Sequence, residues 1–126
     1  MEKIKSVKFS TYSNNGFTFI ELLIVTAIIA ILASIALMQY INVKANAIES
    51  TMLSDALNCV SKVESWYANM NTYSGFNNSE CVVSKGNSLT ISNLTSTTYT
   101  ITVSNPSARS GRTTCKIDNT GTISWE

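Results

Sequence analysis

The amino-acid sequence predicts an α+β fold in which one long N-terminal helix packs on a small antiparallel β-sheet of three to four strands. Two observations support this prediction. The chain from about Phe17 to Met70 contains neither Gly nor Pro, so no residue in it interrupts a helix. Beyond Gly75, short runs of β-branched and aromatic residues alternate with turn-forming clusters, which is typical of strands with tight connections. The expected shape is a ladle, with the far end of the helix lying across the sheet.

The first part of the predicted helix is apolar on every side. Residues 22–38 carry no charge, and the apolar run from Phe17 to Met38 has 22 residues. At ~1.5 Å per residue a helix of this length spans about 33 Å, close to the ~30 Å core of a bilayer. We therefore predict a single transmembrane helix. A buried helix of a soluble protein is the alternative, but the rest of the chain is too small to surround it.

The segment before this run is basic. Three lysines and one glutamate lie among residues 1–16, which is typical of a chain handled at the membrane with its basic end in the cytoplasm. An ordinary secretory signal is cut after its apolar run, whereas the best break here, at Gly16, precedes it. Cleavage at Gly16 would leave the apolar helix in the mature protein. An uncut signal anchor is the alternative.

Beyond Met38 the helix is expected to become amphipathic. Apolar residues recur at helical spacing, while charges such as Glu49 and Asp55 lie mostly off the apolar stripe. The predicted stripe consists of Ile48, Met52, Ala56, Val60, Val63, Tyr67 and Met70, with Cys59 and Trp66 at its border. A small sheet with one apolar face needs a cover, and this half of the helix supplies it.

Five short runs in the C-terminal part are candidate strands. In the longest, Tyr99, Ile101 and Val103 share one face. The runs are 81–83, 89–91, 99–103, 113–117 and 122–125. The sequence thus divides into a leader (1–16), a transmembrane half-helix (17–40), an amphipathic half-helix (41–72) and a β-sheet head (73–126).

Three cysteines, Cys59, Cys81 and Cys115, allow one internal disulfide and leave one thiol. The predicted topology places the head outside the cytoplasm, where a disulfide persists. Cys59 also suits a small buried apolar position. All three pairings remain open, and we favour a bridge that involves Cys81.

Composition argues against several function classes. The net charge is +1, His is absent, and no Cys pair has close metal-ligand spacing. The acidic residues of the head do not form an acid–base constellation. We therefore expect no enzyme, metal, cofactor or small-molecule substrate, and direct nucleic-acid binding is not supported. A membrane-anchored binding or enzymatic domain is the alternative from a different class.

The string GFTFIELLIV, from Gly16 to Val25, resembles the class III signal of type IV pilins and the related pseudopilins. The matching features are Gly16 before the cut, Phe17 after it, and Glu21 as the fifth residue of the mature chain. Phe17 fits the type IVa group. The strong similarity covers about residues 14–45.

The resemblance implies a structural role. A prepilin peptidase would cut between Gly16 and Phe17 in the cytoplasm and N-methylate Phe17. An inner-membrane assembly platform would then extract the single-pass subunit into a homo-oligomeric helical filament on the bacterial surface, used for adhesion, motility or DNA uptake. The alternative within the family is a pseudopilin of a type II secretion or competence system.

The resemblance also assigns a role to Glu21, which lies four residues from the new N-terminus. Neighbours at this spacing meet on a helix, so Glu21 can pair with the Phe17 ammonium of its own or an adjacent subunit and favour one register of assembly. Relatives often have Gly where this chain has Ala30 and Pro where it has Met38. We therefore expect the helix to be continuous.

Overall fold

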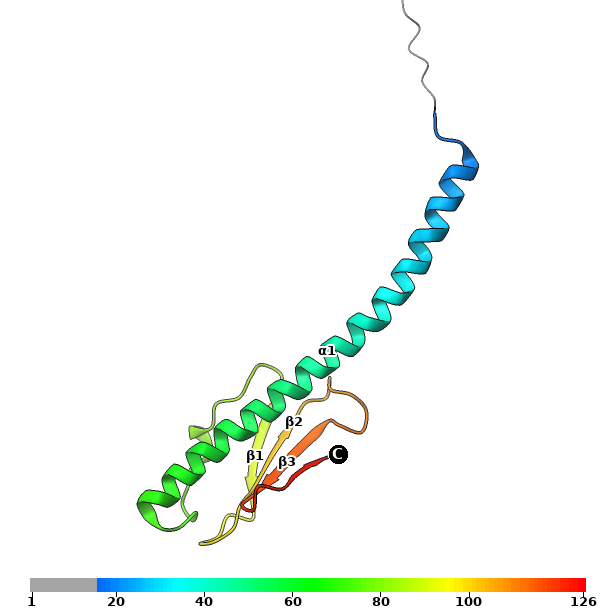
Figure 1. Ribbon diagram of the computed structural model, residues 1–126. Coiled ribbons are helices and arrows are strands. Elements are labelled where there is room, and N and C mark those ends of the chain that lie inside the picture. The colour runs from blue at the N-terminus through cyan, green and yellow to red at the C-terminus, as the bar shows by residue number, and fades with distance from the viewer. Residues whose placement is uncertain (1–15) are drawn as a thin grey trace, which may run out of the picture. The chain divides into compact units, whose positions relative to one another are not determined.

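The computed structural model describes residues 16–126, which form two compact units, one ending at Leu37 and the other running from Met38 to Glu126. Helix α1, Phe19–Met70, has 52 residues and is drawn from blue to green in Figure 1. It continues without interruption through Ala30 and Met38, as expected from the lack of Gly and Pro. The predicted α+β fold is confirmed by this helix and a four-stranded antiparallel sheet.

α1 ends for a local backbone reason. Asn71 takes the left-handed conformation with φ 55°, and its N–H donates to the carbonyl oxygen of Tyr67 at 2.7 Å. Asn tolerates this conformation better than most residues, and the bond satisfies a carbonyl that the helix end leaves open. The sequence placed the helix end correctly at Met70.

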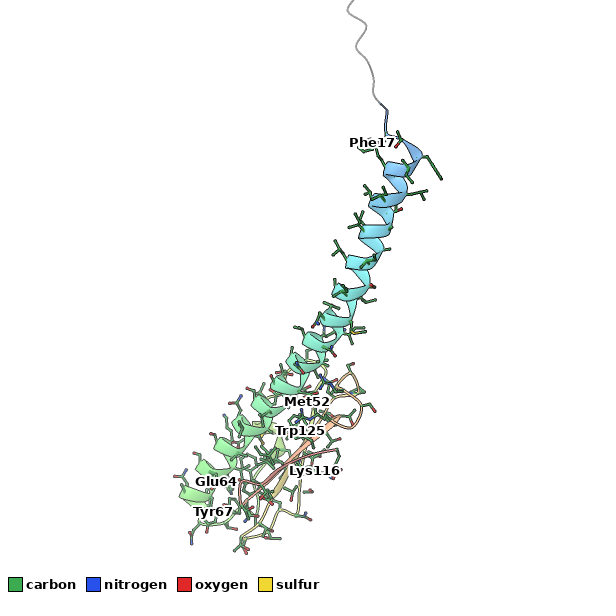
Figure 2. The ribbon with its side chains drawn as sticks, turned by 45° about the vertical axis from the view of Figure 1, so that its right-hand side comes forward. Phe17, Met52, Glu64, Tyr67, Lys116 and Trp125 are labelled. Atoms are coloured by element: carbon green, nitrogen blue, oxygen red, sulfur yellow. A yellow bond between two sulfur atoms is a disulfide. The ribbon has the colours of Figure 1, made fainter. Side chains whose placement is uncertain are left out.

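The first unit is the apolar half of α1. From Phe17 to Leu37 every side chain is exposed, including the large aliphatic ones. Figure 2 shows these side chains projecting around the helix below Phe17. The helix is long and apolar enough to cross a membrane, which fits the predicted transmembrane half-helix.

In the second unit α1 buries one stripe. Met52, Ala56, Cys59 and Val63 are at most 1% exposed. Cys59 therefore lies at the centre of the stripe rather than at its border, and Val60 is only half-buried. Met70 is exposed, contrary to expectation, because α1 ends there.

Two charges that were expected to lie off the stripe are buried, Glu49 and Asp55. Glu49 accepts a hydrogen bond from Arg112 at 2.8 Å. Asp55 accepts from the Ser84 N–H at 2.8 Å and from Asn87 Nδ2 at 2.6 Å. A buried carboxylate is tolerated when it is paired in this way. These partners lie in loops, and the helical spacing of residues in α1 does not predict which loop residues will contact it.

The sheet is a simple antiparallel meander with strand order β1-β2-β3-β4. Its strands are β1 (Ser88–Ser92), β2 (Thr100–Ser104), β3 (Thr114–Asp118) and β4 (Ile123–Trp125). The predicted strand at 81–83 is wrong. That segment follows the 3-10 turn η1 (Asn78–Glu80) as an irregular loop. A disulfide joins Cys81 to Cys59 of α1, and the N–H of Ser84, directly after the segment, donates to Asp55 of α1.

Register brings the apolar residues of the sheet into two rows on one face. Leu89, Val103, Cys115 and Trp125 form one row, and Ile91, Ile101, Ile117 and Ile123 form the other. The central members of both rows are buried against the α1 stripe. Tyr99, Ile101 and Val103 share this face as predicted. Figure 1 shows α1 lying across the sheet.

A polar network closes the far end of this core. Tyr99, 2% exposed, donates to a Glu64 carboxylate oxygen at 2.8 Å, and Tyr73 donates to the same carboxylate at 3.1 Å. Tyr73 also stacks on Tyr67, with ring centroids 4.4 Å apart. Glu64 and Tyr67 lie near the end of α1 (Figure 2). One carboxylate therefore satisfies two buried hydroxyls and joins the helix to the sheet.

We expect Tyr99→Phe to lower the free energy of unfolding by roughly 1.5–3 kcal/mol, because it deletes a hydrogen bond to a charged acceptor. Denaturant unfolding measures the change. Tyr40→Phe is the matched control, since the exposed Tyr40 side chain should tolerate it within about 0.5 kcal/mol. An unfolding free energy unchanged by Tyr99→Phe would show that the bond contributes nothing.

Wild type and Tyr99→Phe also test how the stability contributed by Tyr99 depends on pH. Burial first, and then the Glu64 carboxylate, raise the pKa of Tyr99. The folded state thus keeps Tyr99 neutral, and this contribution to stability is present below the unfolded pKa of ~10 and is lost as pH rises above it. The stability difference between wild type and Tyr99→Phe should therefore narrow above about pH 10.

Candidate processing and assembly site

Gly16 and Phe17 lie at the start of the described chain, outside helical structure. A Cβ added to Gly16 would meet no atom within 4 Å, and Phe17 is 87% exposed. Figure 2 labels Phe17 ahead of the helix. The peptide bond between these residues is therefore accessible. The predicted leader lies outside the described residues except for Gly16.

Glu21 forms a capping box with Thr18. The Glu21 carboxylate accepts from the Thr18 N–H at 2.7 Å and from its hydroxyl at 2.9 Å, while the Glu21 N–H donates to the Thr18 hydroxyl at 3.3 Å. Thr18 directly precedes α1, so the two side chains satisfy N–H groups that the helix leaves open. Sequence analysis missed Thr18, although the Thr-x-x-Glu spacing before an apolar run is a recognised signal.

The capping box gives Glu21 a partner before cleavage. Glu21 contacts Thr18 rather than Phe17, whose nitrogen in the uncleaved chain is an amide and carries no charge. The pairing of Glu21 with a Phe17 ammonium therefore stays a prediction about the cleaved protein. The carboxylate already lies at the helix N-terminus, where negative charge is favourable, and it accepts from the N–H of the residue that follows Phe17.

The disulfide in the structure joins Cys59 of α1 to Cys81, which are 22 residues apart in sequence. Of the three open pairings this is one of the two that involve Cys81. Cys115 keeps a free thiol, which is buried on the face of the sheet that packs against α1. Burial raises the pKa of this thiol. The disulfide and the Asp55 hydrogen bonds together fasten the 81–87 loop to the helix.

Residues 16–126 contain no group of three or more His, Cys, Asp or Glu side chains arranged to hold a metal. The carboxylates of Asp55 and Glu64 on α1 serve structural contacts with the head.

Comparison with known proteins adds two findings. The family model described as the prokaryotic N-terminal methylation motif matches residues 12–37. The fold is similar to the crystal structure of the non-core minor pilin PilV of Neisseria meningitidis, with a TM-score of 0.51 and 20% sequence identity. This match covers 70% of the present chain and 88% of PilV. Among curated proteins, no sequence matches the chain significantly.

The fold and the N-terminal site define a class of protein in which a methylation motif leads directly into an apolar helix that continues into a small α+β head. The chain carries the prokaryotic N-terminal methylation motif, and its fold is similar to that of a minor pilin. The motif and the exposed apolar helix fit anchoring in a membrane.

Proposed function

We propose that this chain is a structural subunit of a type IV pilus. In this proposal a prepilin peptidase cuts between Gly16 and Phe17 and methylates Phe17. Before assembly, the single-pass subunit lies in the inner membrane with its N-terminus in the cytoplasm. An assembly platform then moves it into a helical surface filament.

The observation that carries the proposal is the apolar half of α1. Large aliphatic side chains are exposed on every side of this half. Monomeric proteins in water rarely expose an apolar surface of this extent. A bilayer covers it before assembly, and the same half of neighbouring subunits covers it in a filament. The accessible Gly16–Phe17 bond immediately before this half is where processing would separate the leader from the subunit.

Mass spectrometry of fibres sheared from the cell surface tests the proposal. We expect the chain in these fibres to begin at Phe17 and to carry an N-methyl group. A chain that still begins at Met1 would refute processing. A processed chain found only in the membrane, with none in sheared fibres, would instead favour a pseudopilin.

A further inference from the structure

A pocket of about 380 Å³ lies in the second unit, between α1 at residues 40–45 and the connection from β2 to β3 at residues 107–109. Figure 1 shows this connection, in orange, beside α1. Tyr40 and Lys44 line the pocket from the helix, and Ser107 and Arg109 line it from the connection. None of its lining residues is acidic, so the pocket presents two positive charges and two hydroxyls.

Of the two positive charges of this pocket, Arg109 forms a salt bridge with Glu49. Among residues 16–126, no carboxylate lies within 4 Å of the Lys44 ammonium. Arg109 donates through Nη2 to Asn46 Oδ1 at 2.9 Å, and its Nε lies 3.9 Å from Glu49 Oε1, beyond hydrogen-bond distance. Arg112 is the arginine that binds Glu49 directly, at 2.8 Å. Arg109 and Lys44 therefore keep N–H groups for an anionic ligand.

The place of the pocket along the chain indicates which anion it meets. The apolar run ends at Met38, Tyr40 follows two residues later, and Lys44 is the first charged residue after Glu21. Six residues of helix rise about 9 Å from Met38 to Lys44, roughly from the edge of the hydrocarbon core to the level of the headgroups. Tyr is enriched at this boundary, and Lys and Arg near the ends of membrane helices extend to the headgroups.

We propose that this pocket binds the phosphate of a phospholipid headgroup, with Lys44 and Arg109 donating to its oxygens and Tyr40 packing at the boundary with the acyl chains. Guanidinium and ammonium groups are the side chains that bind phosphate best. The inference rests on the membrane anchoring proposed above. The bound lipid fastens the head to the membrane surface, and extraction of the subunit has to break this contact.

Native mass spectrometry of the full chain in a non-ionic detergent, titrated with phosphatidylglycerol, tests this inference. We expect wild type to bind one lipid saturably. Lys44→Gln and Arg109→Gln should each weaken binding about fivefold, and the double variant about thirtyfold, the effect of roughly one basic contact each. Lys62→Gln with Lys85→Gln is the matched control, because it removes two charges that do not line the pocket, and it should bind like wild type. Circular dichroism checks that each variant is folded.

Two competition arms identify the ligand group. A diacylglycerol-based glycolipid without phosphate should bind at least tenfold more weakly than phosphatidylglycerol, and millimolar inorganic phosphate should not displace the lipid. Equal binding of the glycolipid would show that the protein contacts only the acyl chains. Displacement of the lipid by phosphate would show that the pocket binds the free anion. Either result, or unchanged lipid binding by the folded double variant, overturns the inference. None of these results bears on whether sheared fibres contain methylated Phe17, so the two proposals fail separately.

Discussion

Cells that express Glu21→Val are expected to cleave and methylate the chain as wild type does, yet to yield almost no surface fibre. In the proposed filament, removing the carboxylate would leave the Phe17 ammonium of the cleaved chain without its partner in apolar surroundings. An unpaired buried charge costs about 3 kcal/mol or more, which weakens each subunit association more than about a hundredfold. Quantifying sheared fibres against membrane-bound, processed subunit measures the effect.

The capping box supplies the controls for this experiment. Glu21→Gln retains an oxygen that accepts from the Thr18 N–H but removes the charge, so it should lose fibres as Glu21→Val does. Thr18→Ala removes the cap, at a cost of about 1 kcal/mol, but keeps the charge, so it should reduce fibres far less. Normal fibre yield from Glu21→Gln would contradict the charge-pairing role and leave helix capping as the function of Glu21.

Removing the Cys59–Cys81 disulfide is expected to have the largest effect on the stability of the head. The bridge closes a loop between residues separated by 22 positions, and constraining the unfolded chain over such a length stabilises a fold by about 3 kcal/mol. Cys81→Ala should therefore lower the free energy of unfolding by that amount. We choose Cys81 because it is half-buried, whereas Cys59 is 1% exposed and its replacement would also disturb the core.

Reductant distinguishes the disulfide from packing effects. Dithiothreitol should bring wild type close to the stability of Cys81→Ala and leave Cys81→Ala itself unchanged. Cys115→Ala is the control, since Cys115 has a free thiol, and this variant should keep the full sensitivity to reductant. If wild type and its reduced form unfolded at the same denaturant concentration, the bridge would contribute nothing to stability.

The amino-acid sequence by itself determined the long helix and the four strands that form the sheet, and it predicted the position of the N-terminal site. The lack of Gly and Pro over 17–70 predicted a continuous helix, and its change from uniformly apolar to amphipathic separated an exposed half from a packed one. Alternation at 99–103 predicted which face of the sheet is buried. These features depend on neighbours along the chain, whose side chains report local conformation and burial directly.

Only the tertiary structure decided which distant residues pair. It joined Cys59 to Cys81, buried Asp55 under the 81–87 loop, and turned the predicted strand at 81–83 into that loop. It also brought Arg109 beside Lys44 at one pocket. The physical reason is that the spacing of apolar residues along the chain indicates which side chains are buried. Which distant residue a side chain contacts depends instead on how the loops pack over the helix, and loop packing leaves no periodic pattern in the sequence.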